Sequence, residues 1–439
     1  MTQLTLGIDL GTSGVRSAVL DWNGNVLSMA RGSYGTAPGS RRDPLCWWAA
    51  VSDCIRDQIQ TLIDIEADPT NISGIAVAGT SGSLVLTDAS LSPVTQALMY
   101  DDGGLTPEAD RIATIAPAEH VARGPSSALA RALRLLAEDK DCRASHLLHQ
   151  ADFIAARLLG RGGWTDLNNA LKTGLDPTNA QWPEWMNSLN LPVGLLPKAA
   201  PPGAMLGSID KTVAKEFGLS PFTKVHAGTT DSIAAFLAAA DLTPATAVTS
   251  LGTTLAVKLF SDQRIDEPAL GLYSHKIGDG WLVGGASNTG GGVLRKYFSV
   301  ADLNRLSMQI NPNMESSLDY YPLSSPGERF PINDPILAPR MTPRPPNDAE
   351  FLHALFESMA RIEKRAYQVI ADRGGPHPSR VITSGGGAVN EKWRAIRGRV
   401  LGVPVEKARV TEAAVGAARL VQFGIRAKAT NEREQNTSQ

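Results

Sequence analysis

Several features that define other protein classes are scarce in this chain of 439 residues. Its three cysteines, Cys46, Cys54 and Cys142, are too few and too scattered for a disulfide framework or a zinc site, which favours a reducing compartment. No apolar run approaches the ~18 residues of a membrane span, and strand-like sequence begins close to Met1, which leaves no space for a targeting peptide. The net charge of −2 gives no reason to expect nucleic acid or a membrane as a partner. We therefore expect a cytoplasmic protein that binds small molecules.

Motifs of several catalytic classes are missing as well. The chain has no G-x-x-x-x-G-K-[ST] of a P-loop enzyme and no H-R-D or D-F-G of a protein kinase. The runs Gly79–Ser83 and Gly11–Val15 both lack the last glycine of a G-x-S-x-G nucleophile elbow. Only His146 and His149 have a metal-like spacing, and such a pair is more often a solvated helix face. Any catalysis must therefore depend on other residues.

Two similar turns are the most informative feature that is present. An apolar strand leads through Asp9 into Gly11-Thr12-Ser13-Gly14, and a second run reads Gly252-Thr253-Thr254. Glycine lets backbone N–H groups face an anion and the hydroxyls add donors, so each turn suits phosphate. A carboxylate beside such a turn is useful when Mg2+ lies between them, because Mg2+ prefers a few carboxylates plus substrate phosphates. The pattern favours ATP chemistry, although an isolated turn with Asp9 as a strand-end cap would look the same.

The length predicts about two domains by the rough ~150-residue guide. Residues 4–31 read as three short strands with the hairpin signal Asn23-Gly24, and the strand pattern restarts near residue 240. We assign residues 1–238 to the first domain and 239–426 to the second. Residues 427–439 lack apolar side chains beyond alanine and are expected to be a disordered tail.

An ordered set of motifs resembles the FGGY family of carbohydrate kinases. After the opening hairpin come Ala227–Ser232, Thr249–Thr254 and Ser384–Asn390, and the match covers almost the whole chain. The chain is most similar to the short xylulokinase-like branch whose plant and cyanobacterial members are D-ribulose kinases. The resemblance implies an α/β fold of two ribonuclease-H-like (actin-like ATPase) domains around a central cleft, with the sugar on the N-terminal side and the nucleotide on the C-terminal side.

The resemblance also implies an activity and a set of site residues. The expected reaction is ATP-dependent phosphorylation of the terminal hydroxyl of a ketopentose, D-ribulose to D-ribulose 5-phosphate, with Mg2+ held by Asp9. Asp231 is the expected catalytic base, and the alternative is a first-turn carboxylate that the helix dipole stabilises by about 0.3–1 kcal/mol. The sugar is expected to contact Asp9, Ser81 and Asp231. ATP is expected to contact Gly11, Thr12, Ser13, Gly252, Thr253, Gly386, Gly387, Asn390 and Trp393.

Each of these assignments has an alternative. Trp393 also suits a core aromatic, and the glycine run before it suits a plain strand-to-helix turn, as does Ser81 in its glycine-flanked turn. D-xylulose, L-ribulose and polyols such as glycerol remain alternative acceptors, and a nucleotide-binding regulator with negligible turnover is a rival on the same fold.

One departure from the family bears on the acceptor. Tyr100-Asp101-Asp102 occupies the place of an acceptor-binding segment in many relatives. Many members then have a lysine, an aromatic residue and a tryptophan on the helix near Ser126, where this chain has Ala130–Arg134, with Arg131 and Arg134. The acceptor and the oligomeric state therefore stay open.

Overall fold

The computed structural model describes the backbone of residues 3–437 and the side chains of residues 3–426. It consists of two compact units. Unit 1 contains the chain up to Ala238 and again from Glu412, and unit 2 is Ala239–Thr411. Unit 1 changes to unit 2 after residue 238, and the segment from Glu412, which lies in the sequence range of the second domain, packs with unit 1. Within the described residues, no helix has the length and apolar character needed to cross a membrane.

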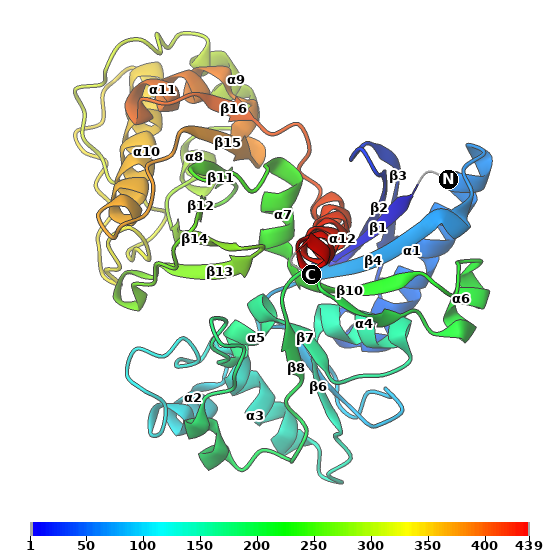
Figure 1. Cartoon of the computed structure of the whole chain (residues 1–439). Coiled ribbons are helices and arrows are strands. Elements are labelled where there is room, and N and C mark those ends of the chain that lie inside the picture. Colours follow the sequence, from blue (N-terminus) through cyan, green and yellow to red (C-terminus); the bar gives the residue numbers. More distant parts are fainter. Residues whose placement is uncertain (1–2, 438–439) are drawn as a thin grey trace. The chain divides into compact units, whose positions relative to one another are not determined.

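Unit 1 is built on a six-stranded sheet in the order β3-β2-β1-β4-β10-β9 (Figure 1). Its strands are β1 (Leu4–Leu10), β2 (Gly14–Asp21), β3 (Val26–Ser33), β4 (Ile72–Gly79), β9 (Met205–Ser208) and β10 (Lys224–Thr230). The first three are antiparallel, and Asn23-Gly24 lies in the β2–β3 turn as predicted. Both β4 and β10 run parallel to β1, so the carboxyl ends of these three strands lie at one edge.

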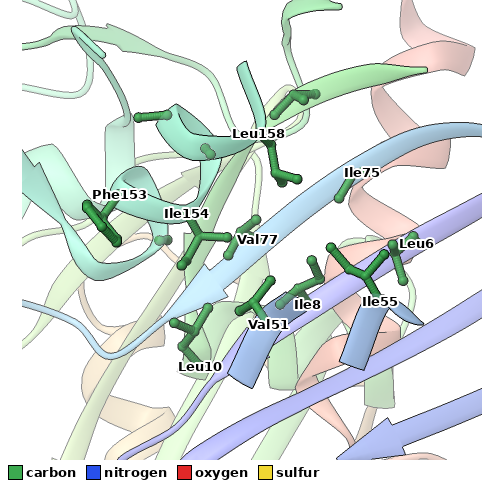
Figure 2. Packing of buried hydrophobic residues seen from close by; sticks show 14 of the residues in the cluster. Leu6, Ile8, Leu10, Val51, Ile55, Ile75, Val77, Phe153, Ile154 and Leu158 are labelled. Carbon is green, nitrogen blue, oxygen red and sulfur yellow. The ribbon is translucent and has the colours of Figure 1, made fainter. Parts of the chain in front are cut away.

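The two faces of β1 carry side chains of different size. Leu6, Ile8 and Leu10 point to the core formed with α1 (Pro44–Asp64) and α4 (Gln150–Leu159), as Figure 2 shows. Gly7 points to the other face, where a Cβ atom would lie 1.9 Å from the carbonyl oxygen of Ala414. Glycine is required there because a helix backbone approaches the strand closely.

The approaching helix is α12 (Ala413–Thr437), which covers this face of the unit 1 sheet. It begins with the small residues Ala413-Ala414-Val415-Gly416, and Gln422 donates from Nε2 to the carbonyl oxygen of Asp21 at 2.8 Å. The helix continues to Thr437, whereas the composition predicted disorder from residue 427. Residues 438–439 of that predicted tail lie outside the described residues.

The long connection between β4 and β10 contains the remaining elements of unit 1. They are β5 (Leu84–Thr87), α2 (Thr106–Ala113), α3 (Ala128–Glu138), β6 (His146–His149), α4, β7 (Trp164–Asp166), α5 (Leu167–Thr173), β8 (Lys198–Ala200), β9 and α6 (Lys211–Phe217). Helix α7 (Asp231–Ala239) follows β10 directly.

Unit 2 has a sheet in the order β13-β14-β12-β11-β15-β16, which repeats the plan of unit 1 in five strands. The sixth strand, β13, lies beside β14, at the end of the sheet opposite to that of β9 in unit 1. Its strands are β11 (Thr246–Leu251), β12 (Leu255–Ser261), β13 (Tyr273–Ile277), β14 (Gly280–Ser287), β15 (Arg380–Ser384) and β16 (Val405–Lys407). Its helices are α8 (Gly291–Tyr297), α9 (Val300–Ser307), α10 (Asp348–Ala371) and α11 (Glu391–Leu401). As in unit 1, the first strand pairs antiparallel with the second and parallel with the strand that follows the long helix.

Candidate active site

The two glycine-threonine turns occupy equivalent positions in the two units. In unit 1 the N–H of Gly11 donates to the carbonyl oxygen of Gly14 at 2.9 Å, and in unit 2 the N–H of Gly252 donates to that of Thr254 at 3.0 Å. A Cβ atom at Gly11 would meet nothing closer than 3.6 Å, and one at Gly252 nothing closer than 3.9 Å. Neither residue has a positive φ. The chain itself therefore does not require glycine at these points, and the open backbone is available to a ligand.

Asp9 lies at the carboxyl end of β1, just before the first turn. Its side chain is 5% exposed, and its Oδ1 atom has no hydrogen-bond partner within the described part of the chain. Burial and the nearby carboxylate of Asp231 raise its pKa to about 7, while Arg16 acts in the opposite direction. A buried carboxylate oxygen without a partner is costly. Asp9 thus fits a site that a cation completes.

No group of three histidine, cysteine or acidic side chains with metal-binding geometry occurs among the described residues. Mg2+ usually keeps several waters and is held by one or two carboxylates together with substrate phosphates. The single carboxylate of Asp9 beside a phosphate-type turn fits that mode of binding. It does not fit a closed structural metal site.

Asp231 is the first residue of α7 and follows β10 directly. Because β10, β4 and β1 are parallel, Asp231 comes to the same edge of the sheet as Asp9. Its Oδ1 atom accepts a hydrogen bond from the N–H of Ser232 at 2.6 Å, and the residue is half-buried. The sheet thus brings together two carboxylates that are 222 positions apart in the chain, 231 − 9.

Ser81 lies in the turn after β4, the strand between β1 and β10. Its Oγ atom is buried and has no hydrogen-bond partner in the described structure. The turn is linked to the first glycine turn by a chain of hydrogen bonds: Thr80 donates to Gln150 Oε1 at 2.7 Å, Gln150 donates to the Tyr34 hydroxyl at 3.4 Å, and Tyr34 donates to the Gly11 carbonyl at 2.9 Å. The predicted sugar contact and the predicted phosphate turn therefore form one connected structure.

Thr12 and Ser13 line a pocket of about 340 Å³ within unit 1. The other lining residues come from the segment between Tyr34 and Arg41. Thr12 Oγ1 also lies 3.3 Å from the hydroxyl of Tyr100. Both hydroxyl residues of the first turn are thus accessible to a small molecule.

The second turn has a cationic neighbour that the sequence did not single out. The N–H groups of Gly291 and Gly292 donate to the carbonyl oxygens of Gly252 and Thr253, each at 2.9 Å. This contact brings Arg295 to the turn, where its Nη2 atom donates to Thr253 Oγ1 at 2.9 Å. Arg295 is 42 residues from Thr253 in the chain. The glycine run before Arg295 suits a close approach of two backbone segments and could have indicated this contact from the sequence.

The predicted adenine-binding residues divide into two groups. Gly386 is exposed, and a Cβ atom there would meet nothing within 4 Å, so its surface is open. Asn390 caps α11 by accepting from the N–H of Trp393 at 3.0 Å and donates to Ser307 Oγ at 2.7 Å. An amide keeps one lone pair and one N–H after two such bonds. Asn390 therefore retains the capacity for a ligand contact.

Trp393 differs from the prediction that it contacts ATP. Its side chain is 2% exposed and stacks on Phe356 with ring centroids 4.8 Å apart. A Cβ atom at Gly387 would lie 2.8 Å from the Trp393 ring. The buried indole has no free surface for a nucleotide and packs against the glycine turn. Trp393 is therefore a core aromatic, which was the alternative to an ATP contact.

A buried ion pair holds the strands that carry the unit 2 turns. Glu363 and Arg397 are 0% and 1% exposed and form two hydrogen bonds at 2.6 and 2.7 Å. Glu363 also accepts from Thr249 of β11, and Arg397 donates to Thr383 of β15 at 2.6 Å. The network ties both strands together immediately before their turns. It joins residues from four separate segments, which no local pattern could reveal.

Comparison with known proteins agrees with this arrangement. The FGGY family of carbohydrate kinases matches with its N-terminal domain over residues 4–238 and with its C-terminal domain over residues 247–423. A xylulose kinase of Streptomyces rubiginosus is 26% identical over 94% of this chain and 86% of its own length.

Solved structures show the same fold. The xylulose kinase from Rhodospirillum rubrum has a TM-score of 0.81 at 21% identity, covering 96% of this chain and 90% of that one. The Plasmodium falciparum glycerol kinase with ADP also has a TM-score of 0.81, at 15% identity, covering 97% and 90%. With both family domains matched in order, this chain belongs to the FGGY family of carbohydrate kinases, phosphotransferases that act on sugar hydroxyl groups.

Proposed function

We propose that this enzyme transfers the γ-phosphoryl group of ATP to the terminal hydroxyl of a ketopentose, with D-ribulose as the first candidate. The observation that carries the proposal is the pair of carboxylates at one sheet edge, Asp9 with an unpartnered buried oxygen and Asp231 at the start of α7. D-xylulose is the second candidate, because similar proteins are named xylulose kinases.

The proposed chemistry assigns a role to each part of the unit 1 edge. Asp231 takes the proton of the sugar hydroxyl while the oxygen of that hydroxyl attacks the γ-phosphorus. The bond between the γ-phosphorus and the bridging oxygen of the β-phosphate breaks, which leaves ADP and a sugar phosphate. Asp9 would hold Mg2+, which when bound neutralises charge on the phosphate oxygens. The unpartnered Oγ of Ser81 suits a sugar hydroxyl. A buried hydroxyl without a hydrogen-bond partner is unfavourable, so a hydrogen bond to the sugar would be stabilising.

The remaining assignments follow the two turns. We propose that Gly11, Thr12 and Ser13 contact the transferring phosphoryl group and that Gly252 and Thr253 hold the nucleotide phosphates. The flat, open surface at Gly386 suits adenine, with Gly387 and Asn390 beside it. Trp393 is left out of this set because it is buried.

A coupled assay of ADP release tests the proposal. The purified protein is given ATP and Mg2+ with D-ribulose, D-xylulose, L-ribulose, pentitols or glycerol, and kcat/KM is compared across the panel. We expect release that depends on a ketopentose and is highest with D-ribulose. ATP binding without sugar-dependent release would instead identify a nucleotide-binding regulator and refute the proposal. Sugar-independent release would identify a simple ATPase.

A further inference from the structure

Arg131 stands where the chain departs from many relatives, and the structure shows what it does. It lies on α3 and is 1% exposed. Its Nε donates to the carbonyl oxygen of Met99 and its Nη1 to that of Ser126, both at 2.9 Å. Its Nη2 donates to the carbonyl oxygen of Tyr100. All three of these hydrogen bonds go to backbone carbonyls of the chain.

The same guanidinium lies behind the Ser81 turn. A Cβ atom at Gly82 would be 3.5 Å from Arg131 Nη1, so Arg131 packs against the residue that follows Ser81. The N–H of Tyr100 donates to Ser83 Oγ at 3.0 Å, which joins the Tyr100 segment to this turn a second time. Arg131 therefore fixes two segments relative to each other, one with Ser81 and one with Tyr100.

Tyr100 is the aromatic side chain of its segment and lies next to the first glycine turn. The neighbouring carboxylates are engaged, since Asp101 pairs with Arg41 and Asp102 with Arg42. Tyr100 is 42% exposed, and its hydroxyl lies 3.3 Å from Thr12 Oγ1 in the first glycine turn. An exposed aromatic side chain on a fully braced segment, beside the predicted phosphate turn, is suited to contact a substrate.

We propose that Arg131 is a positioning residue that sets which sugar this site accepts, by fixing Tyr100 against the Ser81 turn. The inference rests on the proposed function, because it concerns the acceptor side of that site. D-ribulose and D-xylulose differ only in the direction of one hydroxyl group, so discrimination between them requires protein groups held in precise positions. A guanidinium is suited to this task because its planar fork of donors loses little freedom on binding several carbonyls.

The test compares Arg131→Lys with Arg134→Lys. Arg134 lies one turn further along α3 and contacts the chain that follows the Tyr100 segment. Its guanidinium donates to Glu108 Oε1 at 2.6 Å and to the carbonyl oxygen of Gly104 at 3.0 Å. We expect Arg131→Lys to raise the KM for ketopentose roughly tenfold and to change the D-ribulose to D-xylulose ratio of kcat/KM at least about threefold. In Arg131→Lys the KM for ATP should stay within about twofold of the wild-type value. In Arg134→Lys both the KM for ketopentose and the D-ribulose to D-xylulose ratio should stay within about twofold of the wild-type values.

A double-mutant cycle separates positioning from general stability. In a Tyr100→Ala background, Arg131→Lys should no longer change the sugar ratio, because the residue through which it acts is gone. Additive effects, or equal changes in the KM values for sugar and ATP, would overturn the inference. If Arg131→Lys does not fold by circular dichroism, Ser83→Ala decides, since it removes the other bond that places Tyr100. An unchanged sugar ratio in Ser83→Ala then refutes the inference.

The failure of this inference is distinct from failure of the proposed function. If the wild-type enzyme shows sugar-dependent ADP release while the Arg131 variant keeps the wild-type sugar ratio, only the inference is refuted. If the wild-type enzyme releases no ADP with any sugar, both are refuted.

Discussion

Five strands of each sheet, β3-β2-β1-β4-β10 in unit 1 and β14-β12-β11-β15-β16 in unit 2, share one topology, but the sheets differ in charge at the same edge. Asp9 on β1 is paired with Ala78 on the parallel strand β4, and Ser250 on β11 is paired with Ser384 on β15. Each of these β1 and β11 residues stands two positions before the glycine of its turn. Unit 1 therefore has a carboxylate where unit 2 has a hydroxyl.

The difference extends to the neighbouring residues. Unit 1 adds a second carboxylate, Asp231, at the end of β10, whereas the unit 2 turn is contacted by the cation Arg295. An acidic edge suits a metal ion and a general base, and a neutral edge with one arginine suits a polyanion. One backbone plan thus serves two tasks through a few side chains, which is the usual relation between fold and function.

The largest effect is expected at the acidic edge. Asp231→Ala should lower kcat roughly 10² to 10⁴-fold, the range of general-base catalysis, with little change in nucleotide affinity. Steady-state ADP release and ATP titration measure the two quantities. Asp210→Asn is the control, because Asp210 is also an aspartate at the start of a unit 1 helix, as the N-cap of α6. A variant at Asp231 with full turnover would remove it from the mechanism.

The free energy of unfolding should depend on pH through the buried carboxyl group of Asp9. The pKa of Asp9 rises from 3.8 to about 7 on folding, mainly through burial, so the folded state holds this proton more tightly. The free energy of unfolding should therefore fall as pH rises from about 4 to about 7, and Asp9→Asn should recover roughly 2 to 4 kcal/mol at pH 8. At pH 4 the gain should nearly vanish. Urea unfolding at both pH values measures it.

Asp21→Asn is the control for this stability measurement, because folding lowers the pKa of Asp21 and raises that of Asp9. Slight burial acts to raise the pKa of Asp21, but hydrogen bonds from Asn25 and Asn23 lower it in the folded protein. Its stabilising effect is present at neutral pH and lost in acid, so the variant should show no gain at pH 8. A gain as large as that of Asp9→Asn would mean that loss of any carboxylate, not of a buried one, is responsible.

The cationic side of the comparison is tested at Arg295. If this guanidinium helps hold nucleotide phosphates, Arg295→Met should raise the KM for ATP roughly tenfold, as expected for loss of a charge-assisted hydrogen bond. The KM for sugar should stay constant. Arg305→Met is a matched control, because Arg305 is an exposed arginine of the same unit that pairs with Asp302. Equal effects of the two variants would attribute the change to net charge alone.

The smallest effect is expected at the open glycine surface of unit 2. Gly386→Ala places its methyl group in empty space, so it should leave stability unchanged or raise it by about 0.4–1 kcal/mol, yet weaken ATP binding a few-fold. Gly387→Ala should instead destabilise unit 2 by about 1–3 kcal/mol, because its methyl group would lie 2.8 Å from Leu251 and Trp393. Thermal unfolding with and without ATP distinguishes the two outcomes.

Local patterns predicted those parts of the structure that depend on neighbouring residues. Asn23-Gly24 placed the β2–β3 turn, and the change of unit after residue 238 was read from the restart of the strand pattern. The role of Arg131 was not predictable, because it depends on contacts with distant segments. For Trp393 the sequence left a choice between an ATP contact and a core aromatic, which only its contact with the distant Phe356 decides. The same holds for α12, whose apolar pattern does not say which sheet it covers.

The placement of α12 has a consequence for biosynthesis. Unit 2 is one uninterrupted stretch of chain, whereas the sheet of unit 1 is completed by a helix that is translated after all of unit 2. The backbone of that helix packs directly on Gly7 of β1. While the ribosome is still making unit 2, β1 therefore has one bare face, and unit 2 can finish folding before the part of the protein that began first.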